Sequence, residues 1–250
     1  MRTNTAATLG AAAFAVGALS SATAQNVYSV NVVGYVNVVV PHGYSIIANP
    51  LSSTDNSVNG LFLANSTNAG AYSPVLGDSI LLWSGTGFVN GQASNPYGAG
   101  AGTSNGGWPN PTFQLPPGTG FYFNNVNAQF TNTFVGTVVQ GSTNPVPTGY
   151  SLQGSQWPVA TNLVQLGLDG GLSNASPTNG AGDTLLTLVN GSFAGFSKNP
   201  YAPYTWKAGN ALYNNLVDPT NGPFINVGQG FFYQNNQGVA LTWAQNFTVQ

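Results

Sequence analysis

The chain has 250 residues, and only 3% of them are Asp, Glu, Lys or Arg, whereas an ordinary globular protein has about 25%. It contains no glutamate, no cysteine and a single histidine. Zinc sites, disulfide frameworks and phosphate-binding surfaces each need residue types that are missing or scarce here. The composition therefore disfavours most acid–base, metal and nucleic-acid chemistry, and we expect no cofactor.

The first two dozen residues have the order of a secretory signal peptide. Arg2 supplies a positive n-region, residues 6–19 are apolar and rich in alanine, and Ala22-Thr23-Ala24 offers a cleavage site. The alternative is an uncleaved anchor helix, but the apolar run is short for a membrane span. We expect residues 1–24 to be removed and the rest to be secreted, to the extracellular space, cell surface or periplasm.

The mature chain would carry Lys198 and Lys207 against five aspartates, a net charge of −3. Binding to nucleic acid or to anionic lipid needs clustered cations. We therefore expect no nucleic-acid partner and no membrane insertion of the mature chain. Because cysteine is absent, stability must come from burial and backbone hydrogen bonds.

Residues 25–39 form a valine-rich β arm ahead of any repeated motif. In an extended strand, Val30 and Val32 face one side, and Val33 and Tyr35 face the other, with a kink expected at the intervening glycine. Apolar residues on both faces predict burial on both sides. The arm either completes the sheet of its own first domain or adds to the sheet of a neighbouring copy.

Four short motifs recur in the same order at offsets of 104 to 110 residues. The pairs are residues 40–46 with 146–152, 77–82 with 182–187, 95–97 with 199–201, and 117–123 with 227–233. A constant order of four motifs indicates a duplication. The sequence predicts two tandem copies, residues 40–141 and 146–250, with a turn-rich linker at 140–145.

Each copy is predicted to be all-β. Aromatic and β-branched runs bounded by Gly, Pro and Asn, such as residues 44–48, 79–83 and 121–123, are typical of strands. Only residues 58–64 and their counterpart 162–168 have room for one or two helical turns. Longer helices are disfavoured by the 16 prolines, since an interior proline costs about 3 kcal/mol. The expected fold is two small β-sandwiches or barrels in tandem.

The first copy has Gly-Tyr-Ser at 43–45, Asn-Pro-Leu at 49–51, Gly-Asp at 77–78 before a strand ending in Trp83, Asn-Pro-Tyr at 95–97, and Gly-Thr-Gly-Phe at 118–121. This order is similar to a β-rich repeat of uncharacterised secreted bacterial proteins, and residues 28–37 resemble their mature N-terminus. The second copy departs from it, with Ser-Gln-Trp at 155–157 and Leu188 in place of Trp83. The resemblance implies export and a β fold, and it brings no site residues.

The candidates for catalysis are the five aspartates and His42. A glycosidase needs two carboxylates flanking one bond, and Asp78 and Asp183 occupy equivalent positions in different copies. However, an Asp between Gly and a strand is usually a turn residue that accepts backbone N–H bonds. His42 matches Thr148 in the second copy. The one Gly-x-Ser-x-Gly spacing, at 102–106, stands in a glycine-rich run that is followed by Trp108-Pro109 and not by the helix that a nucleophile elbow requires. We expect no catalytic residue and no metal site.

Aromatic residues set among Asn, Gln, Gly and Ser are the best candidates for a binding face, because flat rings can stack on sugars while amides bond the hydroxyls. The candidate ligand-binding residues are Trp108, Tyr97, Tyr201, Tyr204 and Trp206. The alternative is that such rings form the core, and this interpretation is favoured for Trp83 and Phe121.

Three functions follow, in this order. The first is a secreted, non-enzymatic cell-surface or matrix protein that acts by adhesion or self-association, because the charge that normally keeps strand edges apart is missing. The second is a polysaccharide-binding protein, and the third is an Asp-based glycoside hydrolase. Coplanar exposed rings would favour the second function, whereas a detached arm or an open sheet edge would favour the first.

Overall fold

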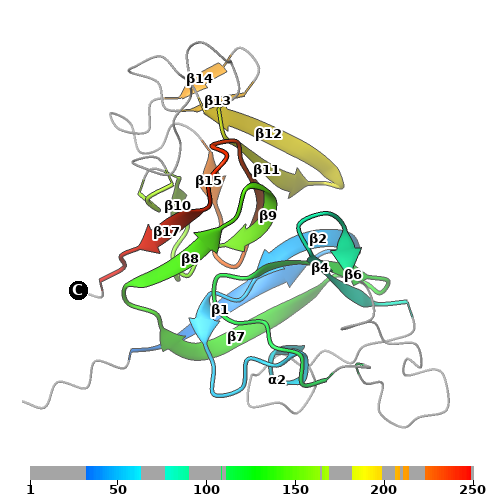
Figure 1. Ribbon diagram of the computed structural model, residues 1–250. Helices are drawn as coiled ribbons and strands as arrows, with labels where there is room; N and C mark the ends of the chain where they lie inside the picture. The colour runs from blue at the N-terminus through cyan, green and yellow to red at the C-terminus, as the bar shows by residue number, and fades with distance from the viewer. Residues whose placement is uncertain are drawn as a thin grey trace, which may run out of the picture. The chain divides into compact units, whose positions relative to one another are not determined.

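The computed structural model describes residues 32–62, 77–89, 108, 111–163, 165–168, 182–198, 206–208, 211–213 and 223–248. Within these ranges the chain has seventeen strands and one short helix, α2 (Val58–Phe62), so the predicted all-β class is confirmed. The helix lies where one was predicted, and in its predicted counterpart the described residues 163 and 165–167 form turns. Residues 31–250 belong to one compact unit (Figure 1). The predicted signal peptide lies outside the described residues.

In the first half of the chain, two antiparallel sheets and α2 enclose one core. The larger sheet has the order β2 (Gly43–Ala48), β6 (Gly120–Asn125), β4 (Ser79–Trp83), β5 (Phe88–Val89), and the smaller has the order β1 (Val33–Val40), β7 (Phe130–Val138), β3 (Leu51–Ser52). Both sheets and the helix contribute to the core, for example through Phe121, Phe134 and Phe62. Phe121 is fully buried, as expected.

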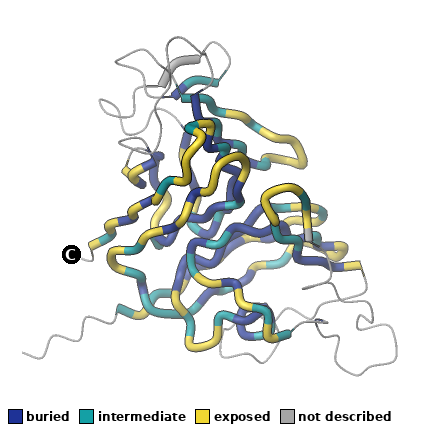
Figure 2. Tube along the Cα trace, in the orientation of Figure 1, coloured by how far each residue is buried: buried dark blue, intermediate teal, exposed yellow. Residues whose placement is uncertain are grey.

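The second half repeats this strand order. Its larger sheet runs β9 (Gly149–Gly154), β16 (Gly230–Asn235), β11 (Thr184–Val189), β12 (Ser192–Lys198), β13 (Trp206–Ala208), β14 (Ala211–Tyr213). Two further pairs are β8 (Ser142–Val146) with β17 (Leu241–Gln245), and β10 (Thr161–Asn162) with β15 (Phe224–Ile225). A second core contains Phe231 and Trp243. Figure 2 shows buried segments gathered where the sheets face each other and exposed residues at the β11–β12 turn.

The segments that precede each copy both form strands. β1 pairs with β7 along its whole length, from Val33 opposite Thr137 to Val40 opposite Phe130, so residues 33–39 of the predicted arm belong to a sheet of their own chain. β8 pairs with β17 in the same antiparallel sense, and the predicted linker at 140–145 is largely this strand. Residues 33–39 are buried on one face and not on both as expected, because one face of their sheet meets the core and the other meets solvent.

The two halves join through backbone hydrogen bonds at a seam formed by residues 47–48, 118–120, 153–154 and 228–230. The amide of Ala48 donates to the carbonyl of Gly228 at 2.8 Å, and the amide of Gly154 donates to the carbonyl of Gly118 at 2.9 Å. In the repeat, Ala48 corresponds to Gly154, and Gly118 corresponds to Gly228. The two bonds are therefore equivalent, as in an isologous dimer interface.

The close approach at the seam explains its glycines. A Cβ added to Gly120 would lie 2.5 Å from the carbonyl oxygen of Gln153, and one added to Gly230 would lie 2.7 Å from the carbonyl oxygen of Ile47. Both obstructing atoms belong to the backbone, so neither can move aside as a flexible side chain would. The Gly-x-Gly motifs are needed here because any side chain would push the halves apart.

We expect Gly120→Ala and Gly230→Ala each to lower the free energy of unfolding by about 1–3 kcal/mol or more, because they overpack the seam. Gly87→Ala is the matched control, since its added Cβ meets nothing within 4 Å, and its unfolding free energy should change by about 0.5 kcal/mol or less. Urea denaturation measures all three. Equal stability of the three variants would contradict the steric account of the seam.

Candidate functional site

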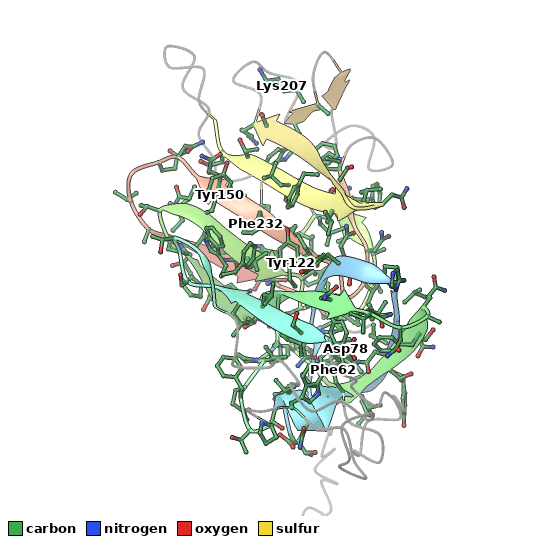
Figure 3. The ribbon with its side chains drawn as sticks, turned by 90° about the vertical axis from the view of Figure 1, so that its right-hand side faces the viewer. Phe62, Asp78, Tyr122, Tyr150, Lys207 and Phe232 are labelled. Carbon is green, nitrogen blue, oxygen red and sulfur yellow. The ribbon has the colours of Figure 1, made fainter. Side chains whose placement is uncertain are left out.

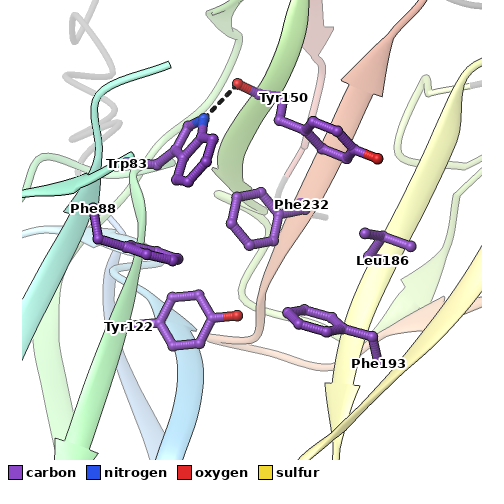
Figure 4. Close-up of a pocket in the computed structure, with 7 residues that line it drawn as sticks. All are labelled: Trp83, Phe88, Tyr122, Tyr150, Leu186, Phe193 and Phe232. Carbon is purple, nitrogen blue, oxygen red and sulfur yellow. Dashed lines mark hydrogen bonds between the residues drawn. The ribbon is translucent and has the colours of Figure 1, made fainter. Parts of the chain in front are cut away.

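An aromatic cleft lies between the two halves. It has a volume of about 260 Å³ and is lined, among the described residues, by Trp83, Phe88, Tyr122, Tyr150, Leu186, Phe193 and Phe232 (Figure 4). The first three come from β4, β5 and β6, and the others from β9, β11, β12 and β16. Figure 3 shows Tyr122, Tyr150 and Phe232 gathered where the halves meet, away from Phe62 in the first core.

The cleft exists because the two large sheets are apolar on both faces. Successive side chains of a strand point to opposite faces. In β6, Phe121 and Phe123 enter the first core, and Tyr122 between them faces the cleft. In β16 the neighbours of Phe232 enter the second core, and Phe232 faces the cleft.

The lining largely follows the repeat. Phe232 is the counterpart of Tyr122. Phe193 is the counterpart of Phe88, because Phe88 begins β5, which pairs with β4, and Phe193 lies near the start of β12, which pairs with β11. Two positions break the symmetry. Leu188 replaces Trp83, and Phe232 lacks the hydroxyl of Tyr122. The cleft is therefore chemically different on its two sides.

Phe232 is the centre of the ring cluster. Its ring centroid lies 5.3 Å from that of Trp83, 6.0 Å from that of Tyr122, and 6.1 Å from those of Tyr150 and Phe193. Ring planes in the cluster meet at 52° to 88°. Each edge-to-face contact adds about 0.5–1.5 kcal/mol beyond its buried area. The cleft rings thus hold the halves together, and they do not form a coplanar platform.

The polar side-chain atoms of Trp83 and Tyr122 in the cleft differ in whether they have a hydrogen-bond partner. The indole Nε1 of Trp83 donates to the backbone oxygen of Tyr150 at 2.8 Å. Tyr122 is only 8% exposed, and its hydroxyl has no hydrogen-bond partner among the described residues. It points across the cleft toward Phe193 (Figure 4). Burial raises the pKa of Tyr122 to about 12.

Two of the five residues predicted to bind a ligand are buried in the cores. Trp108 is 4% exposed and belongs to the first core, and Trp206 is fully buried in the second. Neither ring has a free face on which a sugar could stack, so these two residues are corrected to core residues. Tyr97, Tyr201 and Tyr204 lie outside the described residues.

The signal for the cleft was present in the sequence. A run of three aromatic residues in a strand must place rings on both faces, and residues 121–123 and 231–233 are two such runs. Trp83, expected in a core, lines the cleft. Phe88 and Phe193 gave no comparable signal, because each is a single aromatic residue after a glycine-containing turn.

Asp78 and Asp183 act as turn residues, as predicted. Asp78 Oδ1 accepts the amide of Val126 at 2.9 Å, and Asp183 Oδ1 accepts the amide of Asn236 at 2.8 Å. His42 is exposed, and its Nδ1 lies 2.9 Å from the carbonyl oxygen of Asn127.

Within the described residues, no three His, Asp or Glu side chains gather where a metal ion could bind. The same part of the chain has no helix of the length and apolar character that a membrane crossing requires.

Neither a protein-family model, nor a curated protein, nor a solved structure matches this chain. What the site does is therefore inferred from its own residues.

The raised pKa of Tyr122 has a measurable effect on stability. The folded protein keeps a phenol proton that the unfolded chain releases near the ordinary tyrosine pKa of 10. This stabilisation is therefore fully present below pH 10 and is lost as the pH rises through about 12. We expect the difference in unfolding free energy between the wild type and Tyr122→Phe to change over this interval, to the disadvantage of the wild type. Denaturation at several pH values checks this, and a constant difference would contradict it.

Phe232→Ala should lower the unfolding free energy by about 3–5 kcal/mol, since it removes a buried ring. Phe193→Ala is the comparison, because Phe193 belongs to the same cluster but is half-exposed, and it should cost about 1 kcal/mol. Urea melts of both variants test the central position of Phe232. Similar losses of unfolding free energy in the two variants would contradict the central position of Phe232.

Proposed function

We propose that this chain is a secreted, non-enzymatic structural or adhesive protein of the cell surface or extracellular matrix. Copies of it associate by adding strands to one another's sheets at the β1 edge, the free side of Val33–Val40. One observation carries the proposal: β1 is an eight-residue edge strand whose outward side chains are largely apolar.

The β1 edge lacks the features that usually prevent association. In the described residues β1 has one neighbour, β7, and the register between them runs without a bulge. Natural edge strands are commonly protected by charge, proline, bulges or short length. Neither β1 nor β7 contains a charged residue or a proline. No described strand pairs with the free side of β1, and we expect another strand to add there.

The outward face of β1 favours burial. Val33, Tyr35 and Val39 are 54% to 73% exposed, and the β7 residues opposite them are Thr137, Val135 and Thr131. A second sheet that continued this face would remove its apolar surface from water, and apolar burial is the dominant favourable term in association.

Net charge does not oppose this association. The mature chain would have a net charge of −3, and proteins near neutrality associate more readily than highly charged ones. The pairing of β1 within its own chain favours addition at the free edge over exchange of the arm between copies.

The other two functions have less support. Stacking on polysaccharide needs exposed rings, and among the candidates only Tyr97, Tyr201 and Tyr204 still stand as predictions. Hydrolysis needs free carboxylates, whereas Asp78 and Asp183 bind the backbone after β6 and β16.

The test places a charge on the β1 edge. Val39→Lys introduces an ammonium on the outward face of β1, and Val239→Lys is the matched control at another exposed valine. Sedimentation velocity and negative-stain microscopy of the secreted form should show concentration-dependent assemblies for the wild type and the control. For Val39→Lys the association constant should fall at least tenfold, since a lysine on an edge strand opposes pairing.

Circular dichroism melts confirm that both variants fold. A wild type that stays monomeric at every concentration would overturn the proposal, and so would equal association of the two lysine variants.

A further inference from the structure

We propose that the aromatic cleft binds a small, uncharged aromatic molecule that carries one hydroxyl or carbonyl group. The rings of the cleft hold its apolar body, and the Tyr122 hydroxyl hydrogen-bonds its polar group. This inference is independent of association at the β1 edge, because β1 contributes no residue to the cleft.

The size of the cleft fits such a molecule. A buried apolar cavity of about 150 Å³ holds one benzene ring, and the cleft measures about 260 Å³. It therefore has room for two fused rings and is too small for a long chain or an oligosaccharide. A ligand that entered it would also cover Phe88 and Phe193, which are half-exposed at its mouth.

The chemistry of the lining excludes charge. Its seven described residues are six aromatic side chains and one leucine, and none of them is ionised at neutral pH. An ion that moved from water into such a site would lose hydration without gaining a partner. Edge-to-face rings present both positive edges and negative faces, and a further aromatic ring can pack against either.

The Tyr122 hydroxyl points to a polar group on the ligand. The residue is 8% exposed, and its hydroxyl is aimed into the cleft without a hydrogen-bond partner among the described residues. Packing of the halves does not require it, because the equivalent position in the second copy is Phe232, which packs in the same cluster with no hydroxyl. A ligand that displaces water from the cleft would leave this hydroxyl unpaired, which is unfavourable, unless an acceptor or donor on the ligand bonds it.

The test compares 2-naphthol with naphthalene on the secreted form of the full mature chain. The two probes share a two-ring body, and only the first carries a hydroxyl. Isothermal titration calorimetry should show that the wild type binds both and prefers 2-naphthol about three- to tenfold, the ratio expected for one hydrogen bond. Tyr122→Phe should bind the two probes with equal affinity.

Two variants serve as controls. Tyr44→Phe removes a phenol that contacts Tyr122, with ring centroids 6.2 Å apart, from outside the cleft lining, and it should keep the preference. Leu186→Trp should fill the cleft and weaken both probes at least tenfold. If Leu186→Trp fails to fold, the comparison of Tyr122→Phe with Tyr44→Phe still decides.

Absence of binding at the solubility limit of both probes would overturn the inference. So would a preference for 2-naphthol that persists in Tyr122→Phe, because the hydroxyl would then have no part in binding. Val39→Lys should bind 2-naphthol like the wild type, which keeps the outcome separate from that of the assembly experiment.

Discussion

The close approach of two backbones at the seam is the constraint on which the rest of this structure depends. Paired hydrogen bonds link Ala48 with Gly228 and Gly154 with Gly118, and they form only because no Cβ intervenes at Gly120 or Gly230. This contact brings the outer faces of the two large sheets together. An antiparallel sheet normally exposes one face to water, but here both faces are apolar, and the second face is covered by the other half. The aromatic cleft is the part of that contact that the two sheets leave unfilled.

A chain with so few charges must satisfy its buried polar groups by other means, and it does so with amides in equivalent places. Asn125 Nδ2 donates to the carbonyl oxygens of Pro41 and Ala128, at 3.1 Å and 3.0 Å. Its counterpart Asn235 donates to Val146 and Val239, at 3.2 Å and 2.8 Å. Each amide thus links the turn after its own strand, β6 or β16, to the end of β1 or β8 in the same half. Neutral amide side chains thus bond the backbone groups that charged side chains bond in many other proteins.

Part of this fold could be predicted from the sequence, and the rest depended on contacts that no local pattern encodes. Glycine, proline and aromatic runs indicated strands, the recurring motifs indicated equivalent positions such as Tyr44 and Tyr150, and Gly-Asp before a strand indicated turn carboxylates. The burial of Trp108 and Trp206 could not be told from exposure, because a tryptophan beside proline or lysine suits either place. Strand β8 was hidden by the same Gly, Ser and Pro content that suggested a linker. The cleft was missed because aromatic runs show that both faces of a strand are apolar, but not what covers the second face.

The two halves differ in which of two neighbouring aromatic positions carries a hydroxyl. Phe123 faces the first core, and its counterpart Tyr233 faces the second, where its hydroxyl donates to Asp183 Oδ2 at 2.8 Å. At the neighbouring position the assignment is reversed: the first copy has Tyr122 and the second has Phe232. The core hydroxyl has a carboxylate beside it, as a buried polar group requires, whereas the cleft hydroxyl has no partner among the described residues. Equivalent strands of the two halves therefore carry one hydroxyl that a carboxylate of the protein satisfies and one that faces the cleft.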